Sequence, residues 1–209
     1  MSLTFLSYIG ASFLIGSVPF GFLIAKKYGL DIRKKGSGNI GATNVSRILG
    51  WKVGLPVLLL DIVKGVVPPL AIRIFYSDTQ EILALLCGVA AVLGHMFSPF
   101  LKFKGGKGVA TSFGVFSVLA PIPILATLIV FLSLKRIFGF VSIGSIGGAI
   151  ALPISYVLFA IWQSKDYNTP TFWTICGISF AILILHRTNL IRLLQGREFA
   201  SDKEKYKDQ

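Results

Sequence analysis

Two polar stretches in an otherwise apolar chain carry residue types that bind phosphate. In FKGGKGVAT, three glycines (Gly105, Gly106 and Gly108) alternate with Lys104 and Lys107. Glycines let a backbone approach a ligand and turn successive N–H groups toward an anion, and a helix beginning after them adds its positive end. The stretch is not a Walker A loop, because Gly rather than Ser or Thr follows the second lysine. The alternative is a glycine turn whose lysines only orient the chain in a membrane.

The stretch GSGNIGATNVSR has a similar character. Its glycines offer backbone N–H groups, its small polar side chains offer neutral hydrogen bonds, and its arginine offers a fork for phosphate. These residues are Gly36, Ser37, Gly38, Asn39, Gly41, Thr43, Asn44 and Arg47. Asn44 and Arg47, three apart, would share one helix face. A capped surface loop is the alternative, but a cap explains only one such residue.

A third polar stretch, HRTNLIRLLQGRE, follows the last apolar segment. His186, Asn189 and Arg192 recur every third residue, roughly on one helix face, and Glu198 follows. Anchoring at the membrane interface is the alternative for His186 and Arg187. Ser142 and Ser145 open another apolar segment, where helix capping or close packing competes with a binding role.

Asp61 and Lys64 lie inside an apolar segment, three residues apart. Charges within a membrane are costly and are usually paired or functional. We expect a structural ion pair between them.

The elements that position these residues are membrane helices. The chain of 209 residues is 54% hydrophobic and only 14% charged, whereas soluble domains are about a quarter charged. Apolar segments run at about 3–25, 53–75, 81–100, 108–135, 140–162 and 170–186. The fourth is longer than a span needs and contains Pro121 and Pro123, so it predicts two short helices that turn near Ala120.

Splitting the fourth segment gives seven crossings in an all-α bundle, with the N-terminus outside and the C-terminus in the cytoplasm. Of 21 Lys and Arg residues, 18 then fall on the inner side, Arg73 and Lys165 fall outside, and Lys64 lies in the membrane. A re-entrant pair at 108–136 would leave every loop on the same side. All three polar stretches therefore reach one face. We expect a single domain at 1–198 and a charged cytoplasmic tail at 199–209.

The sequence lacks the residue patterns that several types of enzyme need for catalysis. The two histidines form no Cys/His cluster with metal spacing. No G-x-S-x-G elbow is present. Neither His95 nor His186 is followed by the acidic residue of an H-x4-D acyltransferase signature, because Phe100 and Ile191 occupy those positions. What remains is a site that holds phosphate groups at the lipid edge and transfers a group that is already activated.

The three stretches, together with DIVKG at 61–65, resemble the motifs of the bacterial acyl-phosphate:glycerol-3-phosphate acyltransferases, the PlsY family. The resemblance spans residues 1 to about 198, in order, with Ile40 where many members carry proline. It implies that the 1-hydroxyl of sn-glycerol 3-phosphate attacks the acyl carbon of an acyl phosphate. Phosphate leaves, and lysophosphatidic acid enters the membrane, as the first step of bacterial phospholipid synthesis.

The resemblance and the residue chemistry together suggest roles. We expect Lys107, Arg47, His186, Asn189 and Ser145 to hold glycerol 3-phosphate. We expect Ser37, Asn39, Thr43 and the N–H groups of the loop glycines to hold the acyl phosphate and the developing oxyanion. The wider binding set also includes Gly36, Gly38, Asn44, Lys104, Thr111, Ser142 and Arg192, and Glu198 is expected to fix loop structure by pairing with an arginine. The base is either His186 or a substrate phosphate oxygen, and we favour the phosphate.

No cofactor, metal or nucleic acid is expected, and the protein is expected to act as a monomer in the bacterial cytoplasmic membrane, with its active site on the cytoplasmic face.

Two other functions use the same basic clusters. A transporter or flippase for phosphorylated metabolites or lipids would need a polar path to the outer face, which looks apolar. A scaffold that binds anionic lipids would need the lysines but not the glycines. Glycine loops cannot distinguish acyl phosphate from acyl-CoA or acyl carrier protein.

Overall fold

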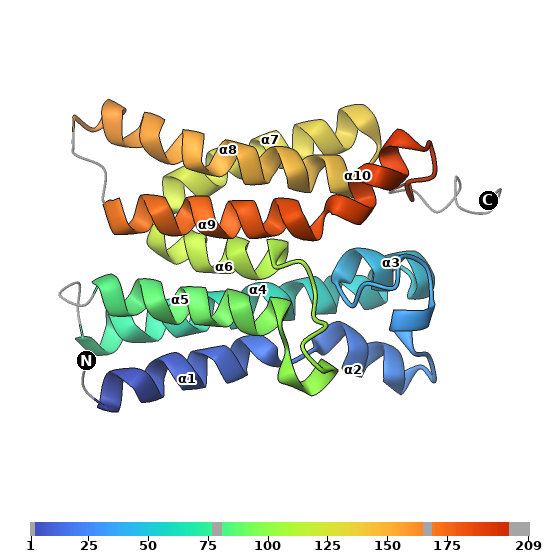
Figure 1. Ribbon diagram of the computed structural model, residues 1–209, viewed down its shortest axis with the longest axis horizontal. Coiled ribbons are helices and arrows are strands. Elements are labelled where there is room, and N and C mark those ends of the chain that lie inside the picture. The colour runs from blue at the N-terminus through green and yellow to red at the C-terminus, as the bar shows by residue number, and fades with distance from the viewer. Residues whose placement is uncertain (1–2, 77–80, 165–168, 201–209) are drawn as a thin grey trace. The chain divides into compact units, whose positions relative to one another are not determined.

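The computed structural model describes residues 3–76, 81–164 and 169–200, and every regular element in these ranges is helical. The chain forms two compact units, Met1–Leu119 and Ala120–Gln209, coloured in chain order in Figure 1. Unit 1 contains α1 (Leu3–Ser17), α2 (Phe20–Lys27), η1 (Ile32–Lys34), α3 (Ala42–Leu49), α4 (Trp51–Tyr76), α5 (Glu81–Met96), η3 (Pro99–Leu101) and α6 (Val109–Leu119). Unit 2 contains α7 (Pro121–Phe138), α8 (Val141–Trp162), α9 (Thr169–Leu185) and α10 (Arg187–Leu194).

Glycines allow the helices of unit 1 to pack closely. In α1 and α5, Gly16 faces the backbone of Ala91, and Gly94 faces the backbone of Phe13. In each case a Cβ on the glycine would overlap the backbone of the neighbouring helix. Small residues at such crossings let membrane helices approach without a steric penalty. The same arrangement joins α4 to α6, and Figure 1 shows α1, α4 and α5 running alongside one another.

The first apolar segment is interrupted, which the sequence reading did not anticipate. We expected one helix over 3–25, but α1 ends at Ser17 and α2 begins at Phe20. The cause is Pro19, which has no N–H to donate to the preceding turn and disfavours helical geometry in the residue before it. The break frees backbone carbonyls in the interior of unit 1.

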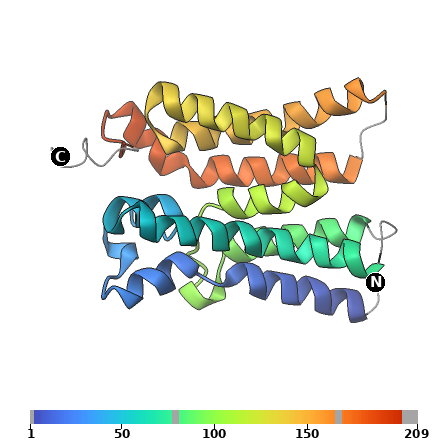
Figure 2. The same cartoon turned by 180° about the vertical axis from the view of Figure 1, so that it is seen from behind.

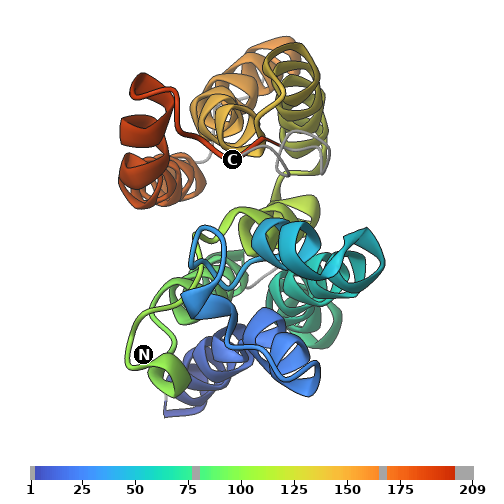
Figure 3. The same ribbon diagram turned by 90° about the vertical axis from the view of Figure 1, so that its right-hand side faces the viewer.

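The fourth apolar segment divides into two helices, as predicted. α6 ends at Leu119, Ala120 is not helical, and α7 begins with a proline at its first position, where the missing N–H costs nothing. α7 ends at Phe138, and the next residue, Gly139, has a φ of 77° that allows its N–H to cap the carbonyl of Lys135. In unit 2, α7 packs against α8 (Figure 2) and α8 against α9, which are seen end-on in Figure 3.

Within the described residues, five segments are long and apolar enough to cross a membrane, if α1 and α2 are taken as one span and α5 with η3 as another. The bent pair α9 and α10 would make six. The break at His186 bends that pair by 48°. α6 has only 11 residues, which gives about 16 Å of helix, and a bilayer core is about 30 Å thick. The structure therefore describes an all-helical membrane protein with five or six candidate spans.

Candidate active site

In chain order the first polar stretch is GSGNIGATNVSR and the second is FKGGKGVAT. The first is a tight loop that leads into α3. Gly36 and Gly38 have φ values of +55° and +71°, a conformation that favours glycine over residues with a side chain. The N–H of Gly38 donates to the carbonyl of Lys35 at 3.0 Å, and the N–H of Gly41 donates to Oδ1 of Asn39 at 2.8 Å. The N–H groups of Gly38 and Gly41 therefore stabilise the loop itself, contrary to the expectation that they face a ligand.

Asn44 holds this loop from the inside. Its side-chain oxygen accepts the N–H of Ser37 at 2.9 Å, and its amide nitrogen lies 2.9–3.3 Å from the carbonyls of Ile32, Lys35 and Asn39. Asn44 is only 1% exposed, so it has no surface for a substrate in this conformation. We therefore replace its expected binding role with a structural one. Thr43 is exposed one position earlier, and Ser37 and Arg47 are half-buried.

The loop of the second stretch folds back onto the end of α5. The N–H of Gly105 donates to the carbonyl of Met96, and that of Gly106 donates to the carbonyl of His95, both at 3.0 Å. Carbonyls in the last turn of a helix lack partners within the helix, and these two are satisfied by the loop. In this conformation the N–H groups of Gly105 and Gly106 are used within the protein, and their expected role at a phosphate stays a prediction.

The end of the same loop retains phosphate-binding features. Lys104 is exposed, and Lys107 is half-buried at the start of α6. Gly108, with φ +85°, is the residue before Val109, the first of α6. The first N–H groups of a helix have no acceptor within it, and they carry the positive end of the helix dipole. Thr111, by contrast, is fully buried and its backbone lies against Gly65 of α4, which removes it from the surface expected to bind substrate.

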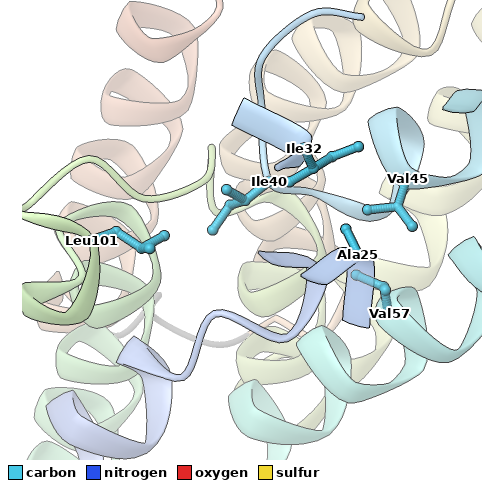
Figure 4. Close-up of a cluster of buried hydrophobic side chains, with 6 residues drawn as sticks. All are labelled: Ala25, Ile32, Ile40, Val45, Val57 and Leu101. Atoms are coloured by element: carbon cyan, nitrogen blue, oxygen red, sulfur yellow. The ribbon is translucent and has the colours of Figure 1, made fainter. Parts of the chain in front are cut away.

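The two stretches share one apolar cluster in unit 1 (Figure 4). Ile40 comes from GSGNIGATNVSR, Leu101 ends η3 directly before the loop of FKGGKGVAT, and both are at least 95% buried. The other buried members are Ala25, Ile32, Val45 and Val57. Burial of this cluster fixes both polar loops to the same end of the unit, away from the N-terminus (Figure 1).

Asp61 and Lys64 form an ion pair of 2.8 Å between Oδ1 and Nζ, and both side chains are at least 96% buried. Lys64 also donates to the carbonyl of Val18 at 2.9 Å, in the break between α1 and α2. Nδ1 of His95 lies 3.7 Å from Oδ1 of Asp61. His95 was not selected by the sequence reading, although GHMFSPF placed it directly before the glycine loop.

In unit 2, His186 lies at the bend between α9 and α10 and is 3% exposed. Its Nδ1 is 2.8 Å from the carbonyl of Ile182. A carbonyl only accepts, so Nδ1 carries the hydrogen, and in the neutral ring Nε2 is the basic nitrogen. The ring is therefore anchored in one orientation by its own helix.

Glu198 closes the end of unit 2 over α10. Its Oε1 accepts a hydrogen bond of 2.6 Å from Nδ2 of Asn189, and its Oε2 accepts one of 2.9 Å from Nε of Arg192. The carboxylate is thus held between two residues of the third stretch. Ser142 and Ser145 are buried in α8, where Ser145 donates to the carbonyl of Val141 at 3.0 Å.

The carboxylates beside the polar stretches are tied to arginines. Asp31, directly before η1, accepts from Nε and a terminal nitrogen of Arg33 at 2.9 and 2.8 Å. These hydrogen bonds lower the pKa of Asp31 to about 2, so it stays ionised at neutral pH. With Glu198 bound to Arg192, neither carboxylate has the properties of a general base.

Comparison with known proteins identifies the class that this fold and these loops define. The family model described as "Glycerol-3-phosphate acyltransferase" matches residues 6–196. The chain belongs to this family of integral membrane enzymes, the PlsY glycerol-3-phosphate acyltransferases.

Individual relatives cover nearly the whole chain. A glycerol-3-phosphate acyltransferase of Leptospira borgpetersenii is 48% identical, over 92% of this chain and 89% of the relative. One from Desulfotalea psychrophila is 45% identical, over 90% and 93%. A crystal structure of PlsY (YgiH), in its glycerol 3-phosphate form, aligns with a TM-score of 0.87 at 37% identity, over 99% of this chain and 100% of that one. Its lysophosphatidic acid form aligns with a TM-score of 0.83 at 36% identity, over the same shares.

The role found for Asn44 makes a stability prediction. Asn44→Ala would leave buried carbonyls and the Ser37 N–H without their partner, which costs about 2 kcal/mol of unfolding free energy. Asn39→Ala is the matched control, because Asn39 is half-buried and its side chain accepts one loop hydrogen bond. Thermal unfolding in detergent measures both. Equal unfolding temperatures for the two variants would contradict the structural role.

Proposed function

We propose that the enzyme transfers a fatty acyl group from acyl phosphate to the 1-hydroxyl of glycerol 3-phosphate. The hydroxyl oxygen bonds to the acyl carbon, the bond from that carbon to the phosphate oxygen breaks, and inorganic phosphate leaves. The products are 1-acyl-glycerol 3-phosphate and phosphate. One observation carries the choice of an activated donor: each described carboxylate near the polar stretches is paired with a cation. Asp31 and Glu198 pair with arginines, and Asp61 pairs with Lys64, so the site has little acid–base equipment.

The solved relatives support the substrate and the product. One PlsY crystal structure is described as a glycerol 3-phosphate form and the other as a lysophosphatidic acid form. These two ligands are the acceptor and the product of the proposed reaction. The identity of the donor is supported by the sequence resemblance and by the chemistry, since phosphate leaves readily without a metal or another cofactor.

For unit 1 we assign phosphate binding to Lys107, Arg47 and the first N–H groups of α6, beginning at Gly108. Lysine and arginine side chains make charge-assisted hydrogen bonds to phosphate oxygens, and a helix N-terminus favours the same charge. Ser37 and Thr43 complete the polar surface of the first loop. Asn39 acts through the loop, because its oxygen accepts the Gly41 N–H.

For unit 2 we assign part of the binding of glycerol 3-phosphate to His186, Asn189 and Ser145, with Arg192 and Ser142 beside them in sequence. Glu198 orients Asn189 and Arg192 through its two hydrogen bonds. The proton of the attacking hydroxyl passes to a substrate phosphate oxygen. His186 remains the other candidate base, through Nε2.

We also propose seven crossings, with the N-terminus outside and the active site on the cytoplasmic face of the bacterial inner membrane. The concentration of basic residues in the loops on one side supports this orientation. In the proposed topology α6 and α7 together return the chain to the side from which it entered. That the enzyme acts as a monomer stays a prediction.

The reaction is tested with detergent-purified protein, glycerol 3-phosphate and palmitoyl phosphate, and with palmitoyl-CoA in parallel. We expect lysophosphatidic acid and phosphate from the acyl phosphate alone. Lys107→Ala and Arg47→Ala should each lower kcat/KM by about tenfold to a hundredfold, through lost charge-assisted hydrogen bonds. Lys102→Ala, in the same loop, is the control and should stay within about twofold. Product from palmitoyl-CoA would overturn the proposed donor.

The base is tested with His186→Asn, whose amide nitrogen can still donate to the Ile182 carbonyl. We expect kcat at saturating substrate to stay within about tenfold of wild type while KM for glycerol 3-phosphate rises, because general-base loss typically costs about 10²–10⁴-fold in rate. Steady-state kinetics separate the two effects. A kcat loss in that larger range, with unchanged thermal unfolding, would make His186 the base.

The topology is tested with single cysteines at the exposed positions Lys102, Arg136 and Gln163, in a background without Cys87 and Cys176. A membrane-impermeant maleimide should label the first two only in inside-out vesicles and the third only in right-side-out vesicles. Opposite sidedness for positions 102 and 136 would rule out the paired crossing of α6 and α7.

A further inference from the structure

His95 is a buried polar side chain to which the proposed reaction gives no role. It lies in the last turn of α5, one residue before the helix ends, and is 5% exposed. Burial alone does not assign its role, because His186 is buried to a similar degree. Its surroundings point to a different use.

One side of the His95 ring is covered by the glycine loop. A Cβ on Gly106 would overlap the ring, with Nε2, Cε1 and Cδ2 as its nearest atoms. The backbone of His95 contacts the loop as well, because its carbonyl accepts the N–H of Gly106 at 3.0 Å. The His95 ring therefore leaves no room for a side chain at Gly106 in this conformation.

The other contact of the ring is with the ion pair of α4. Nδ1 lies 3.7 Å from Oδ1 of Asp61, beyond hydrogen-bond distance but close enough for electrostatic attraction to a ring N–H. Asp61 is itself held by Lys64, which also binds the Val18 carbonyl in the break of the first segment. The ring therefore rests on a buried network that ties α4 to the first apolar segment.

We propose that His95 is a positioning residue, whose ring is the support on which Gly106 rests so that Lys107 and the start of α6 are presented to phosphate. Lys107 follows Gly106 directly, and α6 begins two residues later. A displacement of Gly106 therefore moves the groups that we assign to phosphate. The inference rests on the proposed phosphate role of this loop.

The test is a double-mutant cycle between positions 95 and 106. Gly106→Ala should raise KM for glycerol 3-phosphate by about tenfold or more, with a smaller change in kcat, because the new methyl group collides with the ring and shifts the loop. In a His95→Ala background the same substitution should raise KM by less than about twofold, because the ring atoms with which the methyl group collides are gone.

Gly105→Ala is the matched control. A Cβ at Gly105 would overlap the backbone carbonyls of His95 and Met96, which His95→Ala leaves in place. Its penalty should therefore be the same in both backgrounds. The proposal would be overturned if Gly106→Ala raised KM equally in both backgrounds. It would also be overturned if His95→Ala reduced the rise in KM equally for both glycine variants.

Limited proteolysis gives a readout that does not depend on activity. Trypsin cleavage after Lys104 in detergent should be several-fold faster in Gly106→Ala than in wild type, and it should not rise further in the double variant compared with His95→Ala alone. Unchanged cleavage in Gly106→Ala, at an unchanged unfolding temperature, would overturn the proposal. If Lys107→Ala leaves KM unchanged while the cleavage pattern holds, the phosphate role of Lys107 fails and the support by His95 stands.

Discussion

Two opposite charges inside an apolar helix carry a large desolvation cost, and much of unit 1 is arranged around the way Asp61 and Lys64 offset it. The pair is short, at 2.8 Å, and almost fully buried. Pairing alone seldom repays the loss of water, so further hydrogen bonds are needed. Lys64 finds one at the Val18 carbonyl, which lies in the break between α1 and α2 and also accepts the N–H of Phe20. The interrupted first segment and the ion pair thus compensate each other.

The same need of buried polar groups for hydrogen-bond partners explains the polar loops. Backbone groups that are buried at the lipid edge must find partners, and the loops largely satisfy one another and the ends of helices. Gly105 and Gly106 cap α5, Asn44 binds the turn around Gly36, and Glu198 draws the end of unit 2 onto α10. The glycines serve tight packing first. In the proposed function, phosphate binding falls to a few cations and to the start of α6.

This division suits a reaction with an activated donor. An acyl phosphate needs correct placement and neutralisation of charge more than a strong base, because its leaving group is already stable. The described carboxylates near the loops are each paired with a cation, and Asp31 is kept ionised by Arg33, which lowers its pKa to about 2. The site therefore lacks a strong general base, and an activated donor does not require one.

Much of the architecture could be read from local sequence. Apolar runs gave the candidate spans, and the prolines near Ala120 gave the division into α6 and α7, because hydropathy and proline act on the residues that carry them. Serially ordered motifs were specific enough to indicate the family. The break at Pro19 was also local in origin, but a single proline in a long apolar run did not distinguish a break from a tolerated kink.

The sequence by itself determined the membrane class, the order of helices and the family. Only the tertiary structure decided what each polar group in the loops contacts. The sequence does not distinguish a glycine N–H that faces solvent from one that donates to the carbonyl of His95. It also does not show whether the Asn44 side chain points outward or into its own loop. Those outcomes depend on the three-dimensional path of each loop, which brings the Gly106 N–H to the carbonyl of His95 and the Asn44 amide to the carbonyl of Ile32. No local pattern of residue types encodes that path.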